Sequence, residues 1–328
     1  MHNAVDILEN EMLREMPEVL CELLRDHTTD CNIFWGTNDY ASRGEGYGYH
    51  DAITVERITG DNGRVIVPRV LKDASTQNNR KRTHAEIFTP LWIVNTQVNL
   101  LDEAWFGRQH PFNIEHDGHT WTPVQRRIVF SKDEGKTWRD YVRDTRLEIT
   151  CGEGPYLTSR YDPTTGEYIP VRERVGIVDR KLRVVGEHTR KTGTWLAAAQ
   201  EALKSAYGYE WQGDSLLLAR ENLFYTWIEH YKAKFGDEAK PPEDSCKSAA
   251  DIISWNVFQM DGLKGVVPDS CKPVRVPGLF GETKVTPCPG CKQKDKMNRK
   301  HRGIYVKIMD WEAGKPVKFI SLYDNIYD

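Results

Sequence analysis

Two glycines follow a short apolar segment near the middle of the chain, in the stretch Arg-Leu-Glu-Ile-Thr-Cys-Gly-Glu-Gly that covers residues 146–154. The pattern predicts a strand over residues 146–150 and a helix that begins near Pro155. Glycines at the end of a strand let a ligand approach the backbone closely, as they do in dinucleotide sites. An ordinary tight turn has the same glycine spacing, so this motif alone is a weak signal of binding.

Three more polar residues follow apolar segments that we expect to be strands. Asp179 ends the segment Val-Gly-Ile-Val-Asp, Asp214 follows a short segment around Tyr209, and Asn256 ends Ile-Ile-Ser-Trp-Asn. In a parallel sheet, an acid at the tip of the second strand commonly accepts hydrogen bonds from ribose hydroxyls. Each aspartate could equally cap a helix. Because ligands bind at the carboxyl ends of such strands, these residues together predict one shared crevice.

Short apolar segments alternate with helix-patterned segments from residue 146 onward. This order predicts an α/β fold, with a doubly wound sheet of mainly parallel strands. Residues 5–25 carry apolar residues at helical spacing and predict one or two helices. Two strand-like segments around Ala313-Gly314 predict a terminal β-hairpin. The expected parts are a helical and mixed N-terminal extension (1–85), a core (86–268) with an inserted lobe (107–140), and a basic loop with the hairpin (269–328).

The composition of the 328-residue chain narrows its class. Hydrophobic residues make up 39% of the sequence, which is enough for a real core. The formal net charge is −3, so any nucleic-acid binding must come from local basic patches. No apolar run approaches the roughly 20 residues of a membrane span. The acidic N-terminus lacks the charge order of a signal peptide, and we expect a cytoplasmic protein.

Two basic segments could contact the phosphates of a nucleic acid. Arg80, Lys81 and Arg82 lie in a polar stretch that we expect to be an exposed loop. Residues 284–302 hold seven basic side chains against one acid. The candidate phosphate contacts in this second segment are Lys292, Lys294, Arg299 and Lys300. A solvated surface loop is the plain alternative for both segments.

Seven cysteines are scattered along the chain, an odd number that does not indicate a disulfide framework. Cys288 and Cys291 form one clear Cys-x-x-Cys pair. A zinc site needs four ligands, usually two such pairs. Cys246, Cys271 or His301 could complete a site, but their spacing is not typical. Reduced cysteines beside a Pro-Gly turn are the alternative, and we expect no metal.

These motifs together resemble those of S-adenosylmethionine-dependent DNA methyltransferases that modify amino groups, specifically the adenine-N6 branch of restriction–modification systems. In that family, Phe-Thr-Pro precedes Asp-Pro-x-Cys-Gly-x-Gly, acids follow on the second and third strands, and Asn-Pro-Pro-Tyr/Phe ends the fourth. The resemblance covers residues 86–262. It implies a Rossmann-like methyltransferase that acts on double-stranded DNA, alone or with a restriction or specificity subunit.

The resemblance also implies which residues contact S-adenosylmethionine. Glu148 stands where the family has an aspartate, and the elements before and after it follow the family order. The implied contacts at the methionine end are Phe88, Thr89 and Pro90, and those that form the floor of the site are Glu148, Cys151, Gly152 and Gly154. Asp179 is implied to bind the ribose, and Asp214 the adenine.

On the acceptor side, the resemblance implies that Asn256 accepts a hydrogen bond from the target amino group and localises the nitrogen lone pair. A duplex base must first be flipped out of the stack, and Phe258 would offer it an aromatic face. Gln259 would supply a second amide, and Asp261 would orient an amide. Both family prolines are absent here, and Gln259 replaces the family's aromatic residue. Three alternatives remain: a variant adenine methyltransferase, a methyltransferase for RNA or protein glutamine, and a catalytically silent DNA-binding subunit.

Overall fold

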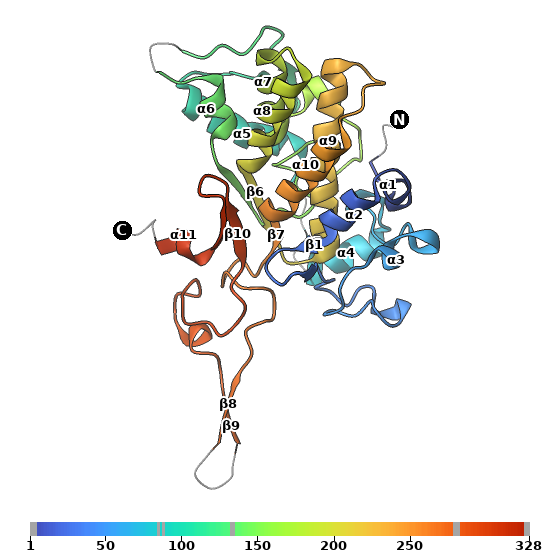
Figure 1. Cartoon of the computed structure of the whole chain (residues 1–328), viewed down its shortest axis with the longest axis vertical. Helices are drawn as coiled ribbons and strands as arrows, with labels where there is room; N and C mark the ends of the chain where they lie inside the picture. The colour runs from blue at the N-terminus through green and yellow to red at the C-terminus, as the bar shows by residue number, and fades with distance from the viewer. Residues whose placement is uncertain (1–4, 84–85, 87–88, 132–134, 278–282, 325–328) are drawn as a thin grey trace.

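A three-stranded parallel sheet lies at the centre of the computed structural model, which describes residues 5–83, 86, 89–131, 135–277 and 283–324. The strands, in sheet order, are β5 (Arg146–Ile149), β6 (Ala206–Glu210) and β7 (Val257–Gln259). Two helices connect each strand to the next: α7 (Ile177–His188) with α8 (Thr192–Lys204), then α9 (Gly213–Phe235) with α10 (Glu243–Asn256). The chain is therefore an α/β protein with strand–helix–strand connections (Figure 1).

The two faces of the sheet have different covers. Ala206 of β6 and Val257 of β7 belong to the large apolar cluster that includes the four connecting helices. On the opposite face, Tyr209 and Phe258 pack with Ile308 and other residues near the C-terminus. This second cover does not reach β5, whose Ile149 is 66% exposed.

Helix α7 corrects the prediction of a strand that ends at Asp179. Val178, Leu182 and Val185 are buried, and their spacing of four and three residues is that of one helix face. Asp179 lies in the first turn of this helix rather than at a strand tip. The β-branched residues suggested a strand, but tertiary packing of the helical face decides the structure.

Helix α10 corrects the prediction of a strand at residues 252–255. These residues form the last turn of a helix whose earlier buried residues include Cys246 and Ala249. Ile253 continues that helical spacing toward the core. Asn256 ends the helix, and β7 begins at the next residue. The polar residue therefore lies at the amino end of β7.

The N-terminal region packs beside this body. Helices α1 (Glu9–Glu15) and α2 (Pro17–Leu24) confirm the prediction for residues 5–25, and α2 contacts α10. The expected basic loop is instead helix α4 (Ala74–Thr83), whose start Asp73 caps by accepting a hydrogen bond from Thr76 N at 2.9 Å. The other elements here are β1 (Arg25–Asp26), β2 (Cys31–Asn32), η1 (Ala41–Arg43), α3 (Val55–Ile58), η2 (Gly60–Asn62) and η3 (Arg69–Leu71).

The segment between this region and the sheet contains helix α5 (Leu91–Phe106), which precedes the expected inserted lobe. The lobe holds a hairpin of two short antiparallel strands and the start of a capped helix. These elements are β3 (Asn113–His116), β4 (Thr120–Pro123) and α6 (Trp138–Arg143); the 3-10 turn η4 (Val171–Glu173) follows β5.

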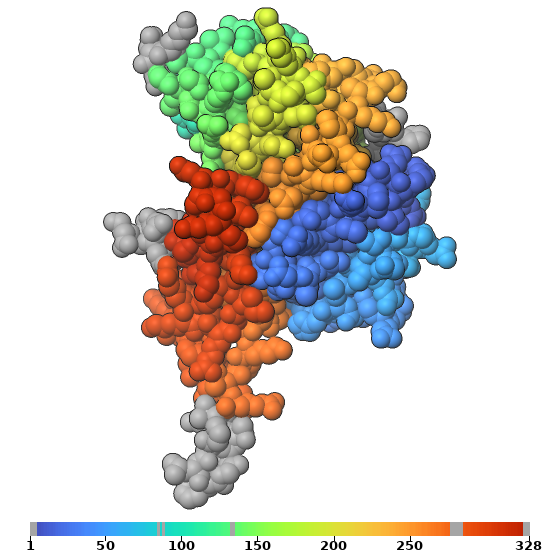
Figure 2. All heavy atoms as spheres, in the orientation of Figure 1, coloured from blue at the N-terminus to red at the C-terminus, as the bar shows by residue number. Residues whose placement is uncertain are grey.

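Residues 262–277 and 283–324, here named the C-terminal lobe, form a narrow projection beside the broader body (Figure 2). A hairpin of β8 (Val274–Pro277) and β9 (Thr283–Thr286) points away from the sheet (Figure 1). The 3-10 turn η5 (Gly290–Lys292) follows it. The predicted terminal hairpin is confirmed as β10 (Lys307–Asp310) and β11 (Lys315–Lys318), after which comes α11 (Ile320–Asp324). None of the described helices is long and apolar enough to span a membrane.

Candidate functional site

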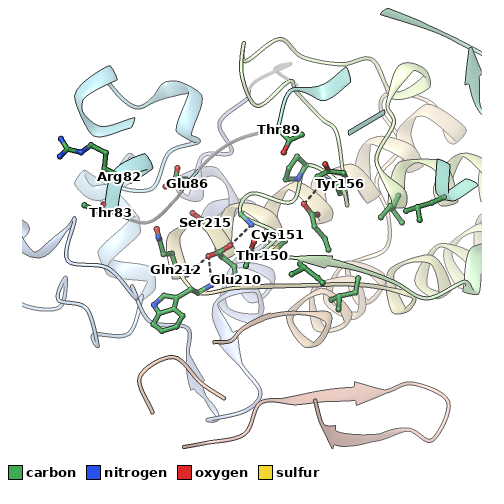
Figure 3. A pocket seen from close by; sticks show the side chains of 18 residues that line it. Arg82, Thr83, Glu86, Thr89, Thr150, Cys151, Tyr156, Glu210, Gln212 and Ser215 are labelled. Carbon is green, nitrogen blue, oxygen red and sulfur yellow. Dashed lines mark hydrogen bonds between the residues drawn. The ribbon is translucent and has the colours of Figure 1, made fainter. Parts of the chain in front are cut away.

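A cavity of about 1000 Å³ lies at the carboxyl ends of β5 and β6. Residues 147–152 form one wall and residues 210–212 form another, while Thr89 and Tyr156 lie over the first (Figure 3). This is the position at which parallel α/β sheets bind ligands. The volume reaches the upper range of small-molecule sites, so it can hold a cofactor together with part of a second ligand.

Glu210 joins the two strand ends at this cavity. One carboxylate oxygen accepts a hydrogen bond from Gly152 N at 2.9 Å. The other accepts from Trp211 N at 2.7 Å and from Gln212 N at 3.2 Å. Burial raises the pKa of Glu210, although these backbone N–H groups act in the opposite direction. Our sequence reasoning missed this residue because it placed the second strand at residues 175–179.

Glu148 supports the turn that follows β5. Its two carboxyl oxygens accept hydrogen bonds from Tyr156 N at 3.2 Å and from Leu157 N at 2.9 Å. Burial raises the pKa of Glu148 to about 8, despite these two backbone donors. The carboxyl group thus fixes residues 151–157 as a turn rather than the predicted helix near Pro155.

The two glycines of this turn have different surroundings. Gly152 has φ +52° and lines the cavity, and a Cβ there would meet no atom within 4 Å. Gly154 has φ +77°, and a Cβ there would lie 3.5 Å from the Ala219 side chain. Left-handed backbone explains glycine at both positions. Only Gly152, however, presents an open backbone to the cavity, whereas Gly154 packs against α9.

Four of the predicted cofactor residues meet at this one cavity: Thr89, Glu148, Cys151 and Gly152. Pro90, beside Thr89, is the residue that precedes the first turn of α5. Phe88 lies outside the described residues. The fold therefore brings Thr89 and the predicted residues of the glycine turn to one cavity, although they come from segments about 60 positions apart along the chain.

Asp179 does not line the cavity. Its carboxylate accepts a hydrogen bond from Ser159 N at 2.8 Å and pairs with His230 Nε2 at 3.1 Å. It is 2% exposed. These contacts join α7 to α9 and to the loop after β5, so the predicted ribose contact is corrected to a structural role.

Asp214 is also absent from the cavity lining, because it belongs to a buried ion cluster. Its carboxylate lies 2.9 Å from Arg80 Nη1 and 3.4 Å from Lys72 Nζ, and it accepts a hydrogen bond from Tyr40 Oη at 2.8 Å. Burial alone would raise the pKa of Asp214, but the charges of Arg80 and Lys72 hold it well below its usual value. The predicted adenine contact is therefore corrected to a structural ion pair.

The same cluster corrects the phosphate-contact prediction for Arg80, which is 1% exposed. Its guanidinium group also pairs with Asp39 at 2.9 Å and donates to Gln212 Oε1 at 2.6 Å. The neighbouring Lys81 and Arg82 are exposed, and Arg82 lines the cavity. Of the three basic residues predicted to contact phosphate in this segment, only Lys81 and Arg82 can therefore reach a phosphate outside the protein.

Asn256 lies at the opposite end of the sheet from the cavity. Its Nδ2 donates to the carbonyl oxygens of Leu203, Lys204 and Ala206 at 2.9, 3.0 and 3.2 Å. Its Oδ1 accepts a hydrogen bond from Trp311 Nε1 at 2.8 Å. The predicted catalytic amide is thus engaged in joining α8, β6 and the terminal hairpin, and its side chain does not face a ligand site.

The other three predicted acceptor-side residues also have structural partners. Phe258 packs in the cluster beneath β6 and β7. Gln259 Nε2 donates to the carbonyl oxygens of Phe34 and Trp211, each at 2.8 Å, while its Oε1 accepts from Phe34 N at 3.0 Å. Asp261 pairs with Lys264 Nζ at 2.6 Å. None of these three side chains lines the described cavity.

Gln259 brings residues 33–40 of the N-terminal extension to the carboxyl end of the sheet. Trp35 O accepts a hydrogen bond from Gly213 N at 2.9 Å, next to the cavity residue Gln212. Asp39 reaches the same wall through Arg80, which contacts both Asp39 and Gln212. The adjacent Asn38 is exposed, and its Oδ1 accepts from Tyr49 N at 3.2 Å.

The C-terminal lobe carries the second basic segment. Lys292, Lys294, Arg299 and Lys300 are exposed there and do not line the cavity. The fold also brings Cys271 and His301 to Cys288 and Cys291, which sequence spacing had not indicated.

No family model, curated protein or solved structure matches this chain. The features of the chain that indicate a function are therefore the cavity, the residues that surround it and the motif resemblance in residues 86–262.

Proposed function

We propose that this protein is an S-adenosylmethionine-dependent methyltransferase that acts on an amino group of a DNA base, with adenine N6 as the first acceptor to test. The observation that carries the proposal is the meeting of a glycine turn and an acid at the tips of two adjacent parallel strands, with a large cavity between them. We further propose that β5, β6 and β7 are the first three strands of a Rossmann-like sheet.

The residues around the cavity suit the parts of S-adenosylmethionine. Glu210 is the last residue of β6, and an acid at this end of the second strand commonly binds ribose hydroxyls. A carboxylate has about four lone-pair sites, and backbone groups occupy three of those of Glu210. The neighbouring Trp211 offers an aromatic surface for the adenine, and Thr89 with Tyr156 lies toward the methionine end. This assignment moves the ribose contact from Asp179 to Glu210.

S-adenosylmethionine supplies an electrophilic methyl group when bound. The chain must hold the acceptor nitrogen in line with that methyl and accept the N–H hydrogen bonds that compete for its lone pair. Because Asn256 is engaged elsewhere, we assign this acceptor role to Asn38. It does not line the cavity itself, but it is the exposed amide of the segment that reaches the Gln212 wall. Its Oδ1 accepts one backbone hydrogen bond and retains a second lone pair.

Two exposed basic groups support DNA as the substrate. Arg82 lies at the cavity, where it can contact a phosphate beside an extruded base. The lysines of the C-terminal lobe add positive charge on a projection of a protein whose net charge is −3. Phosphate contacts of this kind position the duplex but do not read its sequence.

Calorimetry with S-adenosylmethionine tests the cofactor site directly. Glu210→Gln should weaken binding at least tenfold, because the amide nitrogen cannot accept the ribose or backbone hydrogen bonds. Glu167→Gln is the matched control, since Glu167 is exposed outside the cavity, and it should bind like the wild type. A folded wild-type protein that does not bind the cofactor would contradict the proposal.

Transfer of a tritiated methyl group to mixed-sequence duplex DNA tests the acceptor. Label should appear in N6-methyladenine, and Asn38→Ala should reduce transfer at least a hundredfold while leaving cofactor affinity within twofold. Asn79→Ala, at an exposed position of α4, is the control and should retain activity. Near wild-type transfer by Asn38→Ala would contradict the role of Asn38.

A catalytically silent DNA-binding subunit is the second candidate function. The structural engagement of Asn256 favours it, because the residue that the resemblance assigns to the acceptor cannot fill that role in this fold. Cofactor binding without label in DNA, RNA or protein would support this candidate over the enzyme.

A further inference from the structure

We propose that Cys271, Cys288, Cys291 and His301 bind one zinc ion, which fixes the root of the C-terminal lobe. The ligand atoms of these four side chains all lie within 4.8 Å of one another. This proposal replaces the expectation of no metal and does not rest on the proposed methyl transfer.

The spacing of the ligand atoms matches a tetrahedral site. With Zn–S near 2.3 Å and Zn–N near 2.0 Å, the edges of a tetrahedron are about 3.8 Å between sulfurs and about 3.5 Å between sulfur and nitrogen. Cys271 Sγ lies 3.5 Å from Cys291 Sγ. His301 Nδ1 lies 3.3 Å from Cys271 Sγ, 3.9 Å from Cys288 Sγ and 3.7 Å from Cys291 Sγ.

A disulfide does not account for this cluster. The 3.5 Å between Cys271 Sγ and Cys291 Sγ is well beyond the roughly 2.05 Å of an S–S bond, and all three cysteines are free thiols. A disulfide between any two of these cysteines would also not explain why the third cysteine and His301 lie beside them. One metal ion bound by all four side chains explains the whole arrangement.

The histidine ring is oriented for metal binding. His301 Nε2 lies 2.6 Å from the carbonyl oxygen of Lys296. Because a carbonyl can only accept, Nε2 carries the proton, and the lone pair of Nδ1 therefore points toward the three sulfurs. A backbone carbonyl that holds the outer nitrogen of a ligating histidine is the usual arrangement around bound zinc.

The surrounding backbone closes tightly around the cluster. A Cβ at Gly290 would lie 2.6 Å from His301 Nδ1, so only glycine fits between the two cysteines of the Cys-Pro-Gly-Cys turn. Arg302 N lies 3.2 Å from Cys288 Sγ and donates to it. Backbone N–H groups that face a sulfur stabilise its thiolate form, which is the form that binds metal.

The donor set selects the metal and its role. Three thiolates and one imidazole in a tetrahedral arrangement are typical of structural zinc. The protein fills all four positions, so the ion has no place for a reacting water. The site ties residue 271, just before β8, to residues 288–301, just after β9. Zinc therefore closes the root of the projecting hairpin and fixes the exposed lysines around it.

Metal analysis of the full-length chain tests the site. We expect about one zinc per chain by mass spectrometry, and a tetrahedral thiolate spectrum after replacement by cobalt. Cys288→Ser and His301→Gln should each lower the zinc content at least tenfold. Cys21→Ser, which changes an exposed cysteine outside the cluster, should leave it unchanged.

A second measurement covers the case in which a variant fails to fold. Removing zinc from the wild type with a strong chelator should increase the rate of proteolysis within residues 262–303 at least tenfold, and added zinc should restore protection. Folded wild-type protein that neither contains zinc nor binds cobalt would overturn the proposal, as would equal zinc loss in Cys21→Ser. Cofactor calorimetry is independent of these readouts, so the two proposals can fail separately.

Discussion

The sheet region, residues 146–261, and the C-terminal lobe position their polar side chains by different physical means. In the first, the carboxyl groups of Glu148, Asp179 and Asp214 are buried, and each has partners inside the protein. In the second, the lysines are exposed, and the Cys–His cluster brings residue 271 next to residues 288–301. A polar residue in the sheet region is therefore most often structural, because a buried polar group requires a partner.

Arg80→Met should cause the largest loss of stability among the variants of the sheet region. The change removes the main counter-charge of Asp214 and leaves that carboxylate buried, which costs about 3–5 kcal/mol of unfolding free energy. Guanidinium unfolding followed by tryptophan fluorescence measures it. Arg82→Met, two residues along the same helix but exposed, should change stability by less than about 0.5 kcal/mol.

The zinc content of folded Arg80→Met tests whether the two regions are independent of each other. It should equal that of the wild type, because the Cys–His cluster does not depend on the ion pairs of the body. Parallel loss of zinc and of body stability would show that the two regions form one cooperative unit.

Asn256→Ala should give the next largest effect, because this residue connects the two regions. It removes the one amide nitrogen that donates to three backbone carbonyl oxygens and leaves Trp311 Nε1 without its partner, at a cost of about 2–3 kcal/mol. Denaturation measures the loss, and S-adenosylmethionine affinity should stay within twofold of the wild type.

Trp311→Phe is the matched variant on the other side of this contact. It removes the hydrogen bond to Asn256 Oδ1, keeps a smaller aromatic ring where Lys204 Nζ lies 5.5 Å from the Trp311 ring, and should cost about 1 kcal/mol. If Asn256→Ala instead abolished methyl transfer at unchanged stability, Asn256 would regain the catalytic role and the contrast between the regions would weaken.

Glu148→Gln should change the pH dependence of stability, by a smaller amount per pH unit than the losses expected for Arg80→Met and Asn256→Ala. Burial raises the folded-state pKa of Glu148 to about 8, so the folded protein binds a proton that the unfolded chain releases near pH 4.5. The stability that this proton contributes is present below about pH 4.5 and is lost as pH rises toward 8. The wild type should therefore lose about 1.4 kcal/mol per pH unit relative to Glu148→Gln across this window.

Unfolding free energies at several pH values between 5 and 8 measure this slope. Glu167→Gln, at an exposed position, should run parallel to the wild type. A constant difference between wild type and Glu148→Gln would contradict a neutral carboxyl group beneath the cavity.

The sequence predicts some elements well and others poorly, for physical reasons. The strand at residues 146–149 and the terminal hairpin follow from local patterns of turn and strand residues. Short runs rich in β-branched residues fit either a strand or a helix, so the local pattern at α7 and α10 predicts strands where the structure has helices. In α10, only the longer spacing from Cys246 to Ile253 indicates a helix.

The candidate sites show the same division. The glycine turn is local, so its position at a cavity follows once the strand is known. Glu210 is the last residue of a short strand and could have been predicted from that position. The prediction of a second strand at residues 175–179 indicated Asp179 instead. The Cys–His cluster depends on a hairpin that brings residues 271 and 301 together, and no local pattern encodes that contact.

The bridge between Gln259 and Phe34 has a consequence for synthesis of the chain. These residues are 225 positions apart, and a ribosome that adds about 5–20 residues per second needs roughly 10–45 s to make the second after the first. During that interval α2 lacks α10, its packing partner, and its apolar face is exposed. The apolar face of α2 therefore stays uncovered until α10 has been made, and the wall of the cavity near Gln212 is completed only after β7 has left the ribosome.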